Sequence, residues 1–344
     1  MSVLINAYST LRELPAIRFP HDLHGQRSLP DPELSAHLDG FIGYVLPDTP
    51  EGMTAARYHI WCHLKRVRHQ VSLTVADEQL DDFASWASDA NAVLFLPDGT
   101  VRDPSGEVLF DPEDDSDSPG EIPYPPSALQ RRTKSQHLLH ARELPFLEDL
   151  PPVAGDEEVE WQTASDVARR CLALTVTAIT AESLATNSPF PGGAWKHFQE
   201  KCPNGVAALS PDEQAFVQAK SPPQQDVINF AWRYEALFAL QWALGLVETL
   251  PFPAAICDVP LVARLSLDHN SQAWVDSARL RPTTELLDAL DLHYRLEWAT
   301  RNRSFSGVTL EGKAEPGVAH ERYYALNWLA RYENADWDDV DTPT

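Results

Sequence analysis

Charged side chains occur on helix faces that should pack against the rest of the protein. From Asp226 to Glu248 nearly every residue is apolar, so this segment is expected to form a helix buried on all sides. Glu235 lies within it, and Arg233 lies about 160° away around the helix axis, too far to be its partner. An unpaired buried carboxylate is costly, so Glu235 needs a cation from another helix. The candidate cations are Arg322, Arg295 and Arg281.

Two later segments repeat this feature. In the predicted helix Thr283–Arg301, Glu297 and Arg301 lie within the apolar arc, four residues apart with the acid first, which suits a helical ion pair. In the predicted helix Val318–Arg331, Glu321 and Arg322 lie on the apolar stripe. The charges of these helices are therefore expected to point toward other helices.

These residues allow two kinds of chemistry. As a structural network, Glu–Arg pairs would fix how the helices dock, at some cost in stability. As a pocket between helices, Glu235 or Glu321 would act as an acid or base, and Arg322 with Arg295 would bind an anionic group. Aromatic side chains on neighbouring faces suit a ligand wall but more often form plain core. The candidate residues for both interpretations are Glu235, Arg281, Arg295, Glu297, Arg301, Glu321 and Arg322.

Motifs of known metal or catalytic sites are weak or absent. His59 and His63 lie four residues apart, as metal ligands on a helix do, but neighbouring lysines and arginines favour a solvated basic face. His21 and His24 lie in a Pro-flanked loop that could reach such a site. The four cysteines form no paired motif, and the sequence contains no nucleophile elbow and no Walker pattern. We therefore predict no metal and no cofactor, and we assign no catalytic residue.

Residues 1–110 have the pattern of a small α/β domain. Strands and helices alternate, which predicts a layered sheet with helices on one face. The expected strands are Val3–Ala7, Gly40–Leu46, Val71–Val75 and Ala92–Leu96, with a short β meander ending at Phe110, and the expected helices are Thr54–Arg68 and Asp77–Asp89.

Residues 111–126 have the composition of a solvated linker, with six acids, five prolines and no basic residue. Proteases are expected to cut there first. Residues 127–344 carry few strand signals and predict an all-helical domain, so the fold class is α+β: a small N-terminal α/β sheet domain followed by a larger all-α C-terminal domain. The expected helices are Ser127–Glu143, Ser165–Ala185, Ser210–Ala219, Asp226–Glu248, Thr283–Arg301 and Val318–Arg331.

Several short motifs follow one another between about residues 130 and 342. They include Arg131-Arg132, Leu144-Pro145, Trp232-Arg233-Tyr234-Glu235, Leu240-Gln241-Trp242, Asp288, Asp291, Arg295, Trp298, Glu321-Arg322, Asn327-Trp328 and Trp337-Asp338-Asp339. In their order and spacing this part of the chain resembles a bacterial family known as domain of unknown function 4272. The resemblance implies an α-helical fold for the C-terminal part and implies no activity.

The chain carries a formal net charge of -24, with acids concentrated in residues 111–121, 148–160 and 333–341. Such a balance disfavours nucleic acid and anionic membrane surfaces and favours basic partners. The widely spaced cysteines fit a reducing compartment, and the first residues lack the pattern of a signal peptide. We therefore expect a cytoplasmic protein.

Two functions remain open from the sequence. The favoured one is a protein-interaction module whose acidic surface and loose acidic segments bind a basic partner, for example a toxin that it neutralises or a host complex that it regulates. The alternative is an enzyme or small-ligand binder with a Glu/Arg-lined pocket between helices of the C-terminal domain. The sequence does not predict the oligomeric state.

Overall fold

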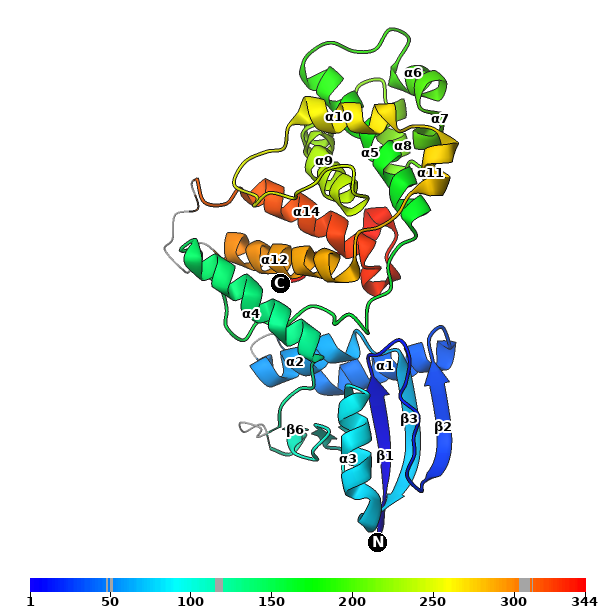
Figure 1. The fold of residues 1–344 in the computed structure, drawn as a ribbon, viewed down its shortest axis with the longest axis vertical. Coiled ribbons are helices and arrows are strands. Elements are labelled where there is room, and N and C mark those ends of the chain that lie inside the picture. The colour runs from blue at the N-terminus through cyan, green and yellow to red at the C-terminus, as the bar shows by residue number, and fades with distance from the viewer. Residues whose placement is uncertain (48, 50–51, 115–119, 303–309, 311) are drawn as a thin grey trace. The chain divides into compact units, whose positions relative to one another are not determined.

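The computed structural model describes residues 1–47, 49, 52–114, 120–302, 310 and 312–344 (Figure 1). The chain forms two compact units. The first comprises Met1–Gln130 together with Asp149–Val159, and the second comprises Arg131–Glu148 together with Glu160–Thr344. The middle of the predicted acidic linker, residues 115–119, lies outside the described residues.

The first unit contains a six-stranded antiparallel sheet in the order β2-β3-β1-β4-β5-β6. Central strand β1 pairs with β3 on one side and with β4 on the other. The strands are β1 (Ser2–Ser9), β2 (Asp22–Ser28), β3 (His69–Ala76), β4 (Ala92–Phe95), β5 (Val101–Arg102) and β6 (Val108–Phe110). The sheet with helices confirms the predicted class of the N-terminal part.

Helices cover both faces of this sheet, and not one face as the alternating pattern predicted. Successive side chains of a strand point to opposite faces, so Ala7 and Tyr8 enter different cores. Ala7 belongs to the core that includes Phe83 and Trp86 of α3 (Leu80–Asp89), which follows the short turn η2 (Asp77–Gln79). Tyr8 belongs to the core formed with α1 (Pro32–Val45) and α2 (Ala55–Leu64).

The prediction of a strand at Gly40–Leu46 is wrong, because these residues lie in and just after helix α1. Asp31 caps this helix through its side chain, proline occupies the first turn, and buried side chains recur from Leu34 to Val45 at helical spacing. The polar edge strand β2 was not predicted, because its segment lacks the apolar alternation of a half-buried strand. His24, assigned to a loop, lies in this strand.

Segments both before and after α4 (Pro126–Ala141) belong to the first unit. Before α4, the Gly120 N–H donates to the Val108 carbonyl, and Ile122 packs against the core beneath α1 and α2. After α4, Glu158 is buried and its carboxylate lies 3.5 Å from Arg66. The second half of the predicted linker therefore packs against the sheet unit.

The described residues of the second unit form helices and no strand, as predicted. Its long helices are α5 (Ala164–Ala185), α9 (Gln224–Ala243), α12 (Thr283–Arg301) and α14 (Pro316–Leu329). Helix α9 contacts both α5 and α14, and α14 also contacts α12 (Figure 1). The shorter elements are α6 (Ala194–Lys201), α7 (Pro203–Ala207), α8 (Pro211–Gln218), α10 (Val259–Asp268), α11 (Gln272–Ser277), η3 (Tyr332–Asn334) and η4 (Trp337–Asp339).

Helix α9 is buried on all sides only in its second half, from Tyr234 to Ala243, whereas Ile228 near its start is 44% exposed. It ends before Gly245, whose φ of 75° lets the chain turn back and satisfy the last carbonyls. Helix α14 is buried around nearly its whole circumference and presents no single apolar stripe. Within the described residues, no helix combines the length and the apolar character that a membrane span requires.

Candidate functional site

The Glu235 carboxylate is buried and paired with Arg322, as the sequence predicts. The Arg322 side chain is 0% exposed and that of Glu235 is 3% exposed, and one guanidinium nitrogen lies 2.9 Å from Glu235 Oε2. The other carboxylate oxygen accepts a hydrogen bond from the Cys257 N–H, and Arg322 also donates to the Pro251 carbonyl. Both Glu235 oxygens therefore have partners.

A second ion pair joins the same two helices next to the first, but here the arginine is on α9 and the glutamate is on α14, and we refer to the two as the crossed pairs. Arg233 of α9 donates to Glu321 of α14 over 3.1 Å, so adjacent residues of α14 bind residues two apart on α9. The Arg233 guanidinium also lies over the rings of Tyr324 and Trp337, at 4.4 and 5.6 Å from their centroids. Burial raises the pKa of Glu321, and the nearby Arg233 opposes that rise. Arg233 was not among the predicted candidates, because it was considered only as a partner for Glu235, from which it lies about 160° away around the helix axis.

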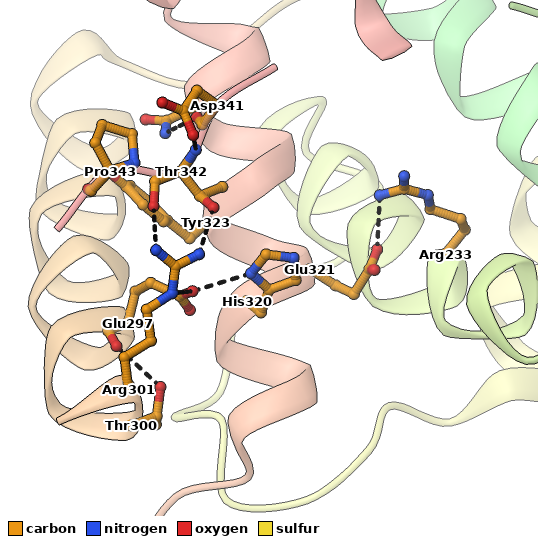
Figure 2. A network of polar contacts seen from close by, with 11 residues as sticks. Arg233, Glu297, Thr300, Arg301, His320, Glu321, Tyr323, Asp341, Thr342 and Pro343 are labelled. Carbon is orange, nitrogen blue, oxygen red and sulfur yellow. Dashed lines mark hydrogen bonds and ion pairs between the residues drawn. The ribbon is translucent and has the colours of Figure 1, made fainter. Parts of the chain in front are cut away.

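Glu297 forms a third cluster, on the α12 side of α14 (Figure 2). Its Oε1 lies 2.7 Å from Arg301 and 3.0 Å from His320 Nδ1. The hydrogen bond to Glu297 raises the pKa of His320, with a smaller contribution from Glu321, while burial and Arg301 act in the opposite direction. The predicted pair of Glu297 with Arg301 is confirmed, and His320 joins it.

The segment after η4 lies against α12 and α14 and is held through its main chain (Figure 2). Arg301 donates to both the carbonyl and the hydroxyl of Thr342. The Tyr323 hydroxyl donates to the Pro343 carbonyl, and the Asn327 amide donates to the Asp341 carbonyl. Arg301 thus joins the Glu297 cluster to this segment.

The remaining candidates have separate partners. Arg295 pairs with Asp291 on its own helix over 3.0 Å, with both side chains buried. Arg281 lies 3.0 Å from Glu285 and donates to carbonyls at the end of α9, including that of Trp242. The seven candidates therefore belong to several distinct pairs in the second unit.

Another buried pair was not predicted. Arg170 of α5 pairs with Glu213, which also completes the capping box of α8 with Ser210. The capping motif was visible in the sequence, but the second role of Glu213 was not, because a residue that caps a helix is expected to be solvated. The available signal was that Arg170 lies between the apolar pairs Val167-Ala168 and Cys171-Leu172 of the predicted helix.

A pocket of about 280 Å³ opens beside Glu235. Its wall includes Val227, Ala231, Trp232 and Glu235 of α9, Ile256 of the following loop and Val259 of α10. Among the seven candidates, Glu235 contributes to this wall. The wall is mainly apolar and does not bring the candidate arginines together.

Two of the side chains that could serve as a metal ligand or a nucleophile, His63 and Cys257, are buried. Burial lowers the pKa of His63 to about 3, so this side chain is neutral and buried and not part of a solvated basic face. Burial also raises the pKa of the Cys257 thiol well above its ordinary value. No group of three His, Cys, Asp or Glu side chains within the described ranges has the arrangement of a metal site.

A family model described as a domain of unknown function (DUF4272) matches residues 131–340, more than half of the chain. The chain belongs to the DUF4272 family. The DUF4272 match contains both crossed pairs, the Glu297 cluster and the wall of the pocket. No curated protein and no solved structure matches the chain.

Proposed function

We propose that this DUF4272 protein is an interaction module that binds a basic protein partner. The observation that carries the proposal is a set of carboxylates held outward on a folded segment, residues 333–341. Asp336, Asp339 and Asp341 are exposed on this segment, while Trp337 and Val340 between them are buried. The segment is therefore folded, and the prediction that it is loose is wrong.

Trp337 anchors this acidic segment. Its ring packs edge-on against Tyr324 and Trp328, at centroid distances of 5.1 and 5.4 Å, and the Arg170 guanidinium lies over it. The Asp338 carboxylate accepts a hydrogen bond from the Asp212 N–H at the start of α8. Because the backbone is already ordered, a partner that binds these carboxylates pays less of the entropy of ordering a flexible tail.

The charge balance supports the same function. The buried carboxylates of Glu235, Glu321 and Glu213 are each paired with an arginine of the same unit, so these pairs add nothing to the net charge. The excess of acids that gives -24 must come from other residues. An acidic surface accelerates encounter with a basic partner and disfavours acidic ones.

The alternative function, an enzyme or small-ligand binder with a Glu/Arg-lined pocket, has less support. Glu235 lines a pocket, but both of its oxygens are engaged by Arg322 and the Cys257 N–H. A carboxylate that serves as an acid or base must be able to reach a substrate proton. Such a role for Glu235 would require its present partners to move.

Co-purification from the organism that encodes the chain tests the proposal. The test variant combines Asp336→Asn, Asp339→Asn and Asp341→Asn, which removes three exposed charges and keeps side-chain size. The matched control combines Glu78→Gln, Asp81→Asn and Asp82→Asn, three exposed carboxylates of the sheet unit.

The wild type and the control should recover the same Lys/Arg-rich protein at about 0.15 M salt, where charges still act over about 8 Å. The test variant should recover about tenfold less of it, as expected when several charge-assisted contacts are lost. Equal recovery by the test and control variants, or recovery of acidic proteins alone, contradicts the proposal.

A further inference from the structure

The pocket beside Glu235 has a mainly apolar wall, and two of its polar side chains already have hydrogen-bond partners. Glu235 binds Arg322 and the Cys257 N–H, and the hydroxyl of Tyr234, which also lines the pocket, donates to Glu182 over 2.6 Å. Pockets for metabolites normally offer polar groups that orient the ligand, and those for drug-sized molecules measure about 300–1,000 Å³. A pocket of about 280 Å³ with a mainly apolar wall and few available polar groups suits one or two apolar side chains better.

Exposed apolar side chains extend this wall to the surface. Ile256, in the loop between α9 and α10, is 63% exposed, and Ile228 of α9 is 44% exposed. Large apolar side chains exposed next to a cavity are typical of protein-binding surfaces, where a central anchor is excluded from water. The pocket therefore resembles a site that holds one anchoring side chain of a protein partner.

Carboxylates flank the lining residues along the chain. Asp226 precedes Val227, Asp258 precedes Val259, and Glu182 accepts the hydrogen bond from Tyr234. None of these three carboxylates forms an ion pair with a basic side chain in the part of the chain that the structure describes. Asp258 accepts the Leu261 N–H as the cap of α10 and still retains its charge. An apolar pocket with negative charge beside it favours an apolar group that has cations next to it.

We propose that this pocket binds a short segment of the basic partner in which a large apolar side chain is flanked by Lys or Arg. The apolar side chain fills the cavity against Trp232 and Ala231, and the cations face Glu182, Asp226 and Asp258. This inference rests on the proposed function and names the part of the partner that this face recognises.

Three labelled hexapeptides test the recognition by fluorescence anisotropy with the full chain. The first is Lys-Lys-Leu-Trp-Lys-Lys, the second replaces Leu-Trp by Ala-Ala, and the third replaces all four lysines by glutamate. The first should bind at least about tenfold more tightly than either of the others, since both the anchor and the charges contribute. Equal binding of the first two peptides, or tighter binding of the glutamate peptide, overturns the inference.

Pocket variants locate the binding. Ala231→Trp fills the cavity, and Ile256→Asp removes an exposed apolar side chain with little effect on the core; each should reduce binding of the first peptide to the level of the Ala-Ala peptide. Ala215→Trp, on an exposed position of α8, is the matched control and should bind as the wild type does. Unchanged binding by both pocket variants overturns the inference.

Charge variants test the flanking carboxylates. Glu182→Gln preserves an acceptor for Tyr234, and Asp258→Ser preserves the helix cap; together they should weaken peptide binding by about three- to tenfold. Tryptamine is the small-molecule competitor. If it displaces the labelled peptide as strongly as unlabelled peptide does, the pocket is a small-molecule site, which contradicts binding of a protein segment. If co-purification depends on Asp336, Asp339 and Asp341 but not on the pocket, this inference fails while the proposed function stands.

Discussion

At the scale of single residues, the two crossed pairs place four charges between α9 and α14, largely shielded from solvent. Arg233 binds Glu321, and Glu235 binds Arg322, so each helix presents both signs within one or two residues. Buried pairs of this kind contribute little net stability, because desolvation offsets the attraction. Their alternating signs instead specify one alignment of the helices, since a shifted alignment would bring like charges together.

Replacing Glu235 by glutamine should destabilise the protein by about 3–5 kcal/mol, because Arg322 would then be buried without a counter-charge. Urea unfolding followed by circular dichroism measures the change. Glu285→Gln is the control: this carboxylate also pairs with an arginine but is 48% exposed, and its loss should cost less than about 1 kcal/mol. A loss below about 1 kcal/mol for Glu235→Gln would show that the pair is not structural.

The titration of His320 should make the free energy of unfolding depend on pH. Glu297 raises its pKa above the ordinary 6.5, so the folded chain binds the proton more tightly than the unfolded chain. The resulting stabilisation is fully present below pH 6.5 and is lost as the pH rises through the raised value in the folded protein. The charged groups that shift the pKa of His320 are Glu297, Arg301 and Glu321.

The melting temperatures of the wild type and His320→Gln, measured from about pH 5.5 to 8.5, test this contribution. The advantage of the wild type should be largest at the acidic end and should shrink as the pH rises. A constant difference between the two proteins across this range would mean that the titration of His320 does not contribute.

At the scale of helices and strands, glycines have opposite roles at two positions. Gly245 has a φ of 75° after the last turn of α9, and its N–H donates to the Trp242 carbonyl. Gly43 lies in helix α1, where an added Cβ would meet no atom within 4 Å. The first glycine is required by the backbone conformation, and the second only weakens its helix.

Gly245→Ala should therefore destabilise the protein by about 1–2 kcal/mol, because alanine is strained at positive φ. Gly43→Ala should stabilise α1 by about 0.5–1 kcal/mol, because glycine is a poor helix residue. Thermal unfolding of the two variants gives the comparison. Changes of the same sign would contradict this account of the two positions.

The sequence predicted the long helices of the second unit and also the short helix α8, but it missed α1, β2 and several short helices. α5, α12 and α14 were found because apolar residues continue over several turns. The segment at Gly40–Leu46 suggested a strand, because its β-branched and aromatic residues outweighed the helical spacing that begins at Leu34. The helices α7, α10 and α11 were not predicted, because tertiary packing stabilises helices too short to show a clear period.

The pairing of Glu235 could be predicted because geometry around one helix excludes Arg233 as its partner. The pairing of Arg233 with Glu321 could not, because the rotation of α14 relative to α9 depends on packing across the whole interface. The pocket could not be predicted either, because its wall combines Ala185, part of α9 and the loop before α10. Such a surface forms only when distant segments meet.

At the scale of the whole molecule, the net charge predicts that the protein does not bind nucleic acids. With a net charge of -24, the chain repels phosphate, and nucleic-acid binding depends on neutralising phosphates with Lys and Arg. We expect no detectable shift of duplex DNA or single-stranded RNA in a mobility assay at about 0.15 M salt. Sub-micromolar affinity under these conditions would show that a local basic surface outweighs the overall charge.

The segment that follows η4 is bound by its carbonyl groups. Asn327, Arg301 and Tyr323 each contact a different peptide unit, from Asp341 to Pro343. Main-chain carbonyls are common to every amino acid, so the contacts at positions 341 and 343 place few demands on the side chains there, whereas Arg301 also binds the Thr342 hydroxyl. Residues 341 and 343 can therefore change under selection for a partner while the segment keeps its position, whereas Thr342, Arg301, Tyr323 and Asn327 must be retained. Sequence variation is therefore expected at residues 341 and 343 of the bound segment, and conservation at the residues that bind it.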